Sequence, residues 1–193
     1  MRPLAMLGVL AVLAGCSTGV PPEVLSEYQS RTLYTCCNIH YEGAEITDAN
    51  YFVGSTLPLG SPVGVEELTS ESVTFSAGAT VLTLYHSYGT EQESAREYFD
   101  KVLVTHDPKK KVAGFPQAVR DAIRDARVER GMTREQVIMS LGYPATHRTP
   151  STSTSEWTYW YNRWITYKVQ FDEGGRVSNV VGRPAPTQDR PVS

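Results

Sequence analysis

The sequence contains few of the residues that enzymes use for covalent or metal chemistry. Only three of its 193 residues are cysteines and only four are histidines, His40, His86, His106 and His147. No two histidines are four residues apart, and no HExxH, GxSxG or phosphate-loop motif occurs. No paired carboxylates stand in a pattern that gives them a catalytic role. The sequence therefore predicts a non-enzymatic protein without catalytic residues, without a metal site and without a cofactor.

Two further absences narrow the class of partner. No run of 18 or more apolar residues follows the N-terminus, so we expect no transmembrane helix in the body of the chain. The net charge is −3, which excludes the broad positive surface typical of nucleic-acid-binding proteins. The remaining composition, 40% hydrophobic and 20% charged, is that of an ordinary globular protein.

The N-terminus has the pattern of an exported lipoprotein. Arg2 precedes an apolar stretch at residues 4–13, which is too short to span a bilayer and suits a signal peptide. Ala14 and Gly15 then precede Cys16, as in the bacterial lipobox. A plain secretory peptide with a chance cysteine is the weaker alternative, because the apolar stretch, the small residues and the cysteine occur in the order that a lipoprotein signal requires. We expect a signal peptide at residues 1–15 and covalent lipid, including palmitate, on Cys16.

The residue after the lipidated cysteine bears on the membrane that receives the protein. Ser17 occupies the position where an aspartate would indicate inner-membrane retention. Resemblance to sorted lipoproteins therefore implies an anchor in the outer membrane, on its periplasmic face. Residues 16–30 contain glycine and prolines and few large apolar residues, so we expect a lipidated tether.

Residues 31–113 are expected to form a β-rich domain. Short β-prone runs alternate with turn residues, which favours a small barrel or half-barrel. A helix is expected at about residues 91–104, with Thr90 and Glu93 as its capping box. Cys36 and Cys37 allow a vicinal disulfide or, with His40, a metal site. The interpretation we favour is a strand with one small apolar side chain on each face.

Residues 114–183 predict a compact module of two helices and three strands. The first helix opens at residues 115–116 and is expected to end at Gly131. Thr133 and Gln136 form a capping box for the second, which Gly142 terminates. Residues 156–161, 164–171 and 176–181 are expected to be strands. The alternation of apolar and polar side chains along the second indicates an antiparallel meander covered on one face. The expected fold class is α+β, with a disordered tail at residues 184–193.

The three strands carry more aromatic residues than one buried face requires. Trp157 and Tyr159 share one face of their strand, and Trp160 lies on the other. Packing against the β-rich domain would explain the surplus, and so would an exposed aromatic patch that binds a protein. The candidate partner-binding residues are Tyr143, Trp157, Tyr159, Trp160 and Trp164.

Four motifs in this module carry a family resemblance. They are GMTREQV at residues 131–137, LGYP at 141–144, WTY at 157–159 and FDEGGRV at 171–177. This pattern resembles the SmpA/OmlA (BamE-like) family of outer-membrane lipoproteins, over about residues 115–181. The resemblance implies a non-catalytic interaction scaffold. Its partners would be envelope proteins, with the β-barrel assembly machinery as the family's candidate.

Two other functions remain open at this point. Two helices on a small sheet can present a loop to an enzyme cleft, so residues 145–155 could make the chain a periplasmic inhibitor or sensor. A cell-wall enzyme would need a cleft lined by His40, His86 or His106, with the β-rich domain as its substrate-binding barrel.

Overall fold

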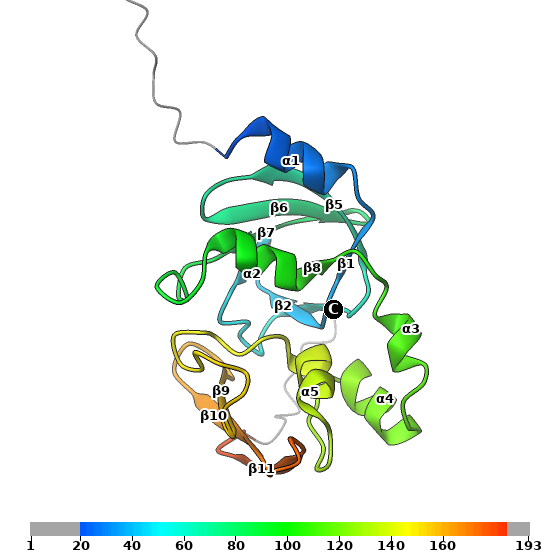
Figure 1. The fold of residues 1–193 in the computed structure, drawn as a ribbon, viewed down its shortest axis with the longest axis vertical. Coiled ribbons are helices and arrows are strands. Elements are labelled where there is room, and N and C mark those ends of the chain that lie inside the picture. Colours follow the sequence, from blue (N-terminus) through cyan, green and yellow to red (C-terminus); the bar gives the residue numbers. More distant parts are fainter. Residues whose placement is uncertain (1–19, 185–193) are drawn as a thin grey trace, which may run out of the picture.

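The computed structural model describes residues 20–184, which form two parts joined end to end (Figure 1). We call residues 22–104 the barrel part and residues 109–184 the C-terminal module. The predicted signal peptide, Cys16, Ser17 and the predicted tail beyond Pro184 lie outside the described residues. Within residues 20–184, no helix has the length and apolar character needed to cross a membrane.

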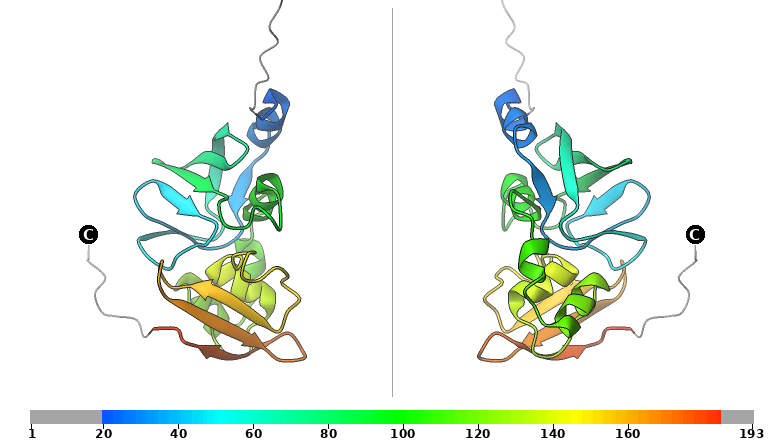
Figure 2. Two further views of the ribbon diagram at one scale, coloured as in Figure 1. Left: turned by 90° about the vertical axis from the view of Figure 1, so that its left-hand side faces the viewer. Right: turned by 90° about the vertical axis from the view of Figure 1, so that its right-hand side faces the viewer.

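The barrel part is built on a curled sheet of six short strands. Their order is β3-β7-β6-β5-β1-β8, and only β3 and β7 run parallel. A separate antiparallel pair, β2 and β4, lies beside it (Figure 2). The strands are β1 Leu33–Thr35, β2 Ile39–Tyr41, β3 Glu45–Thr47, β4 Ser55–Leu57, β5 Pro62–Leu68, β6 Ser72–Ala77, β7 Thr80–Tyr85 and β8 Leu103–Val104.

Alternation along the central strands gives the half-barrel its core. Every second side chain of β5, β6 and β7 points inward, and Val73, Phe75 and Leu82 are fully buried there. Helices α1 (Pro22–Gln29) and α2 (Ala95–Val102) cover this core and add Tyr28 and Phe99 to it. The described part of the expected tether is therefore folded from Pro22 onward, because Tyr28 anchors it to the barrel.

Helix α2 is shorter than the sequence predicts. It begins at Ala95, and its capping box joins Ser94 to Glu97, not Thr90 to Glu93. Its C-terminal end is also different, because residues 103 and 104 leave the helix and pair as β8 with β1. The short strand satisfies backbone groups of β1 that a longer helix would leave open.

The preferred interpretation of the two neighbouring cysteines is wrong. Strand β1 ends at Thr35, and a disulfide joins Cys36 to Cys37 in a bend. Cys36 N donates to Val102 O (2.8 Å) within the barrel part, and Asn38 N, directly after the disulfide, donates to Met139 O (3.2 Å) in the module. The vicinal disulfide thus lies where the barrel part meets the module.

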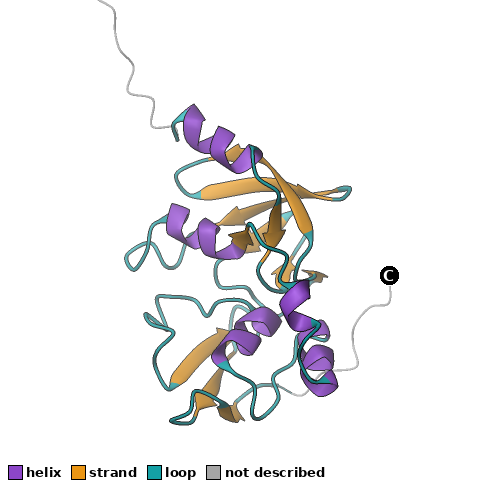
Figure 3. Cartoon of the chain, turned by 45° about the vertical axis from the view of Figure 1, so that its right-hand side comes forward, coloured by secondary structure: helices purple, strands orange, loops and turns teal. Residues whose placement is uncertain are grey.

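The module contains the predicted three-stranded antiparallel meander in the order β11-β10-β9. Its helices and the inner face of this sheet share a second core, and Figure 3 shows the helices beside the strands. This confirms the α+β class, with a half-barrel preceding a three-stranded sheet. The elements are α3 Lys109–Val112, α4 Gln117–Arg124, α5 Arg134–Leu141, β9 Glu156–Trp160, β10 Thr166–Phe171 and β11 Val177–Val181.

The ends of the module's helices test the sequence-based boundaries. The capping box of α5 at Thr133 and Gln136 is confirmed, and Gly142 ends the helix at φ 80°. Helix α4 ends at Arg124, however, several residues before Gly131. Residues between them form a turn, and Gly131 N donates to Val177 O (2.8 Å), so this glycine joins the sheet instead of ending α4.

Two asparagines, the buried Asn38 and the half-buried Asn50, fasten the barrel part to the module. Asn38 Nδ2 donates to Ile123 O (2.5 Å) and Ser140 O (3.0 Å), and its Oδ1 accepts from Leu59 N (2.9 Å). Asn50 Nδ2 donates to Leu141 O (2.6 Å). Helix α5 ends against the barrel part, so these amides satisfy carbonyls that have no partner within the helix.

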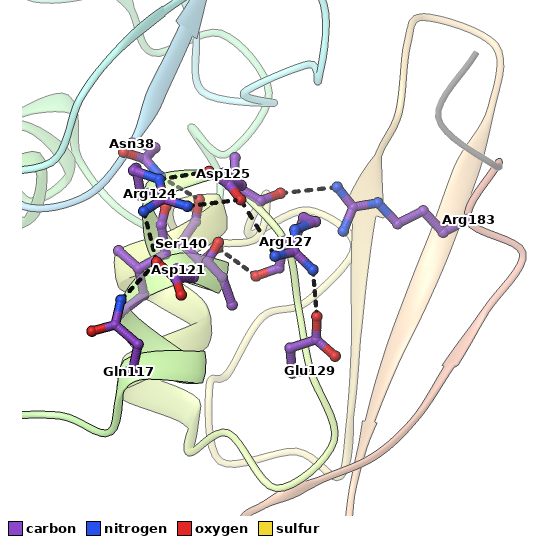
Figure 4. A network of polar contacts seen from close by, with 12 residues as sticks. Asn38, Gln117, Asp121, Arg124, Asp125, Arg127, Glu129, Ser140 and Arg183 are labelled. Carbon is purple, nitrogen blue, oxygen red and sulfur yellow. Dashed lines mark hydrogen bonds and ion pairs between the residues drawn. The ribbon is translucent and has the colours of Figure 1, made fainter. Parts of the chain in front are cut away.

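The polar network of Figure 4 continues from Asn38 to the far side of the module. Ser140 Oγ donates to Arg127 O (2.7 Å), within the turn that follows α4. Arg183 reaches the same turn after β11, where its Nη2 donates to Ala126 O (2.9 Å). The last described residues are therefore attached to the turn that follows α4.

Candidate functional site

Two of the five candidate aromatic residues lie inside the module. Trp157 is completely buried, and its ring lies 4.6 Å from that of Phe171. Tyr159 is also buried, with its ring 5.7 Å from Tyr167 and its hydroxyl donating to Gly142 O (3.1 Å). These two side chains pack the sheet against the end of α5, so they are not accessible to a partner protein.

Trp160, on the opposite face of β9, packs against the barrel part. Its ring meets that of Tyr51 edge-on at 6.2 Å and stacks with His147 at 6.3 Å. The guanidinium of Arg148 lies 5.8 Å from the same ring. Of the two explanations for the surplus aromatics, packing against the β-rich domain holds for this residue.

Trp164 is the one candidate whose side chain projects fully into solvent. It is 88% exposed at the turn between β9 and β10, and neighbouring Ile165 is 40% exposed. Asn162 Oδ1 accepts from the backbone N–H groups of both residues at 2.9 Å, which closes the turn. A large apolar side chain is thus held outward on an ordered turn, as expected for an interface anchor.

Tyr143 lines a groove between the two parts. The groove has a volume of about 310 Å³ and includes Cys36 of the disulfide. Lys101 lies 4.9 Å above the Tyr143 ring, and burial raises the pKa of the tyrosine hydroxyl. His106 also lines this groove, whereas His40 and His86 are buried elsewhere. The three histidines of the cell-wall-enzyme alternative therefore do not meet in one cleft.

The loop of residues 145–155 folds back on the module. Thr149 is buried, and its Oγ1 accepts from Thr158 N at 3.0 Å. Arg134 Nη2 donates to Thr154 O at 3.0 Å and so fastens the other end of the loop to α5. Both ends of the loop are thus held to the module, while residues 150–155 remain exposed.

A buried Asp48–His86 pair is a feature that the sequence analysis missed. The carboxylate of Asp48 lies 2.9 Å from His86 Nδ1, and both side chains are almost inaccessible. The same oxygen accepts the backbone N–H groups of Ser87, Tyr88 and Gly89 at 2.9–3.1 Å. No sequence signal links residues 38 positions apart, and the pair serves to fix the loop that carries Tyr88.

No metal centre accompanies these groups. Within the described part of the chain, no three histidine, cysteine, aspartate or glutamate side chains are grouped so that they could hold an ion. The residues present are suited to binding through aromatic surface and hydrogen bonds. Together, these elements define a two-part α+β protein whose C-terminal module has two helices packed on a three-stranded sheet and an exposed tryptophan at one turn.

Comparison with known families supports this class. Residues 121–181 match the family model described as the outer membrane protein assembly factor BamE domain. The match runs from the middle of α4 through α5 and all three strands of the meander, so the predicted resemblance is confirmed over the C-terminal third. The barrel part lies outside it. Neither a search of curated proteins nor a search of solved structures found a match.

Proposed function

We propose that the chain is a non-catalytic lipoprotein of the outer membrane that binds an envelope protein on the periplasmic face. The observation that carries this proposal is the match of residues 121–181 to a domain of an outer-membrane protein assembly factor. The exposed Trp164 and Ile165 at the β9–β10 turn supply the contact surface. A component of the outer-membrane assembly machinery is the partner that the domain description suggests.

The partner surface can be tested by site-specific crosslinking. A photoreactive amino acid at position 164 should crosslink to a protein of the cell envelope in growing cells. Val81, on β7, is the matched control, since it is 47% exposed but lies in the barrel part. We expect a discrete product from position 164 and none from position 81. Equal products from both positions, or no product from 164, would contradict the proposed surface.

The anchor requires a separate experiment. Cys16→Ser should abolish incorporation of labelled palmitate and release the protein from the membrane fraction, while Ser17→Asp should move it from the outer to the inner membrane. If Cys16→Ser stays in the membrane fraction, the lipid is not the anchor. The crosslinking result at position 164 is independent of this outcome.

A further inference from the structure

The groove between the barrel part and the module is not used by the partner contact proposed above. It has a volume of about 310 Å³, and both parts line it. Lys101 and Val104 come from the barrel part, and helix α5 contributes residues on the module side. An apolar cavity of about 150 Å³ binds one benzene molecule, so this groove has room for a small molecule of roughly twice that size.

The permanently charged side chains of the groove leave one positive charge without a partner. Lys101 lines the groove and forms an ion pair with Glu93. Glu135 also lines it and is paired with Lys111, whose ammonium lies 2.5 Å from the carboxylate. The third such residue, Arg134, forms no ion pair within residues 20–184. An anionic group in the groove therefore meets a guanidinium whose charge is uncompensated.

Arg134 is held in position at the start of α5. Its Nη2 donates to Thr154 O at 3.0 Å, and its guanidinium lies 4.7 Å from the ring of Phe171. Its Nη1 remains a donor, because the described part of the chain offers it no hydrogen-bond partner. A single free cation balances a monoanion such as a carboxylate, and not the greater charge of a phosphate monoester.

The rest of the lining suits an apolar body attached to that carboxylate. Val104, Ile138 and Met139 supply apolar side chains. Tyr143 adds a ring whose hydroxyl stays neutral, because burial raises its pKa. Arg134 begins α5, Ile138 lies one turn further along and Tyr143 follows the end of the helix. The helix rises about 1.5 Å per residue, so it extends roughly 10 Å, which is about the length of an extended eight-carbon chain.

We propose that the groove binds a small monocarboxylic acid with an apolar chain or ring, its carboxylate on Arg134 and its apolar body along α5 toward Tyr143. The carboxylate accepts hydrogen bonds from the guanidinium, and burial of the apolar body supplies the rest of the affinity. Because both parts line the groove, the bound acid also stabilises their packing across the seam. The site contains none of the turn residues assigned to the protein partner, so acid binding and crosslinking at position 164 succeed or fail separately.

Two methionines serve as reporters in the test. Residues 16–193 with Cys16→Ser contain only Met132 and Met139. Met139 lines the groove, whereas Met132 is buried in the core of the module and is not part of the lining. With the methionine methyl groups labelled with carbon-13, added octanoate should shift the Met139 NMR signal saturably and leave the Met132 signal unchanged. Half-saturation is expected at about 1 mM or below for an acid of this size.

Three probes with the same eight-carbon chain separate the head group from the apolar body. Octanoate should bind about tenfold more tightly than 1-octanol or octylammonium, because only octanoate pairs with the guanidinium. Equal affinities for the three probes would overturn the proposal, and so would a Met139 signal that none of them moves. A Met139 signal that responds to a peptide with a free C-terminal carboxylate, and not to octanoate, would also overturn it and assign the groove to a protein terminus.

Matched variants locate the two ends of the ligand. Arg134→Gln should remove the preference for octanoate over 1-octanol and leave the binding of 1-octanol unchanged. Lys110→Gln removes an exposed cation of α3 outside the groove and should keep the full preference. Val104→Phe narrows the groove from the barrel side, keeps Arg134 and should weaken all three probes alike. A preference that survives Arg134→Gln, or unchanged affinities in Val104→Phe, would show that the acid does not bind in this groove.

Discussion

At the scale of single residues, Asn38 has the most consequential side chain in the seam. Its amide bonds three backbone groups from different segments, and it is 2% exposed. Asn38→Ala removes these three bonds, although Ile123 O keeps its bond from Ala126 N, so we expect the free energy of unfolding to fall by about 2–3 kcal/mol. Urea denaturation measures this change. Asn179→Ala, on the exposed face of β11, is the control and should alter stability by less than about 0.5 kcal/mol.

The hydroxyl of Tyr167 should make the free energy of unfolding fall as the pH rises above 10. Tyr167 is buried, and burial raises the pKa of its hydroxyl from 10.0 to about 12. Between these values the unfolded chain loses the proton while the folded chain keeps it, so this stabilisation is complete below pH 10 and is lost as pH rises toward 12. The loss is of order 2–3 kcal/mol for a shift of this size.

Tyr167→Phe tests that assignment by removing the titrating group. The hydroxyl of Tyr167 has no hydrogen-bond partner among residues 20–184, so the variant should have near wild-type stability at pH 7. Denaturation at pH 8, 10 and 11.5 should then give a shallower decline than in the wild type. If both proteins lose stability in parallel over this range, Tyr167 is not the responsible group.

At the scale of elements, helix α2 begins at a different residue from the one that the local sequence pattern predicts. The sequence pattern predicts Thr90 as the capping residue, but the structure uses Ser94. Ser94→Ala should lower the free energy of unfolding by about 1 kcal/mol, because it removes the acceptor of the Glu97 N–H. Thr90→Ala should change it by less than about 0.5 kcal/mol. A larger effect at Thr90 would show that the helix begins earlier.

The predictable elements are those whose signals are local. The capping box at Thr133, the stop at Gly142 and the alternation along residues 166–171 specify α5 and the meander without distant partners. The sequence predicts that helix α4 continues to Gly131, because a glycine commonly ends a helix. In the structure Gly131 N instead bonds Val177 O, a residue distant in sequence, and no local pattern indicates this role. The contacts of Asn38 depend on the packing of the two parts, and the Asp48–His86 pair depends on packing within the barrel part. One sequence specifies neither.

The positions of the candidate aromatic residues, too, could be predicted only in part from the sequence. Alternation correctly put Trp157 and Tyr159 on one face and Trp160 on the other, but it does not say which face a neighbouring part covers. Both faces are covered, one by α4 and α5 and the other by Tyr51 and His147. Only the turn residue Trp164 lies beyond both coverings, and no periodicity marks it.

At the scale of the whole molecule, the seam determines whether the chain unfolds as one unit. The side-chain amides of Asn38 and Asn50 cross it, and residues 105–108 connect the two parts along the chain. We therefore expect one cooperative transition, in which amides of β6 in the barrel part and β10 in the module exchange hydrogen with the same opening free energy.

Tryptophan fluorescence gives a direct check, because all three tryptophans lie in the module, at positions 157, 160 and 164. Their unfolding curve should coincide with the far-ultraviolet circular dichroism curve, to which both parts contribute. Combining Asn38→Ala with Asn50→Ala should separate the curves, since the two cores would then be linked mainly by the chain itself and by ring contacts. If the curves are already separate in the wild type, the contacts across the seam are too weak to couple the two parts.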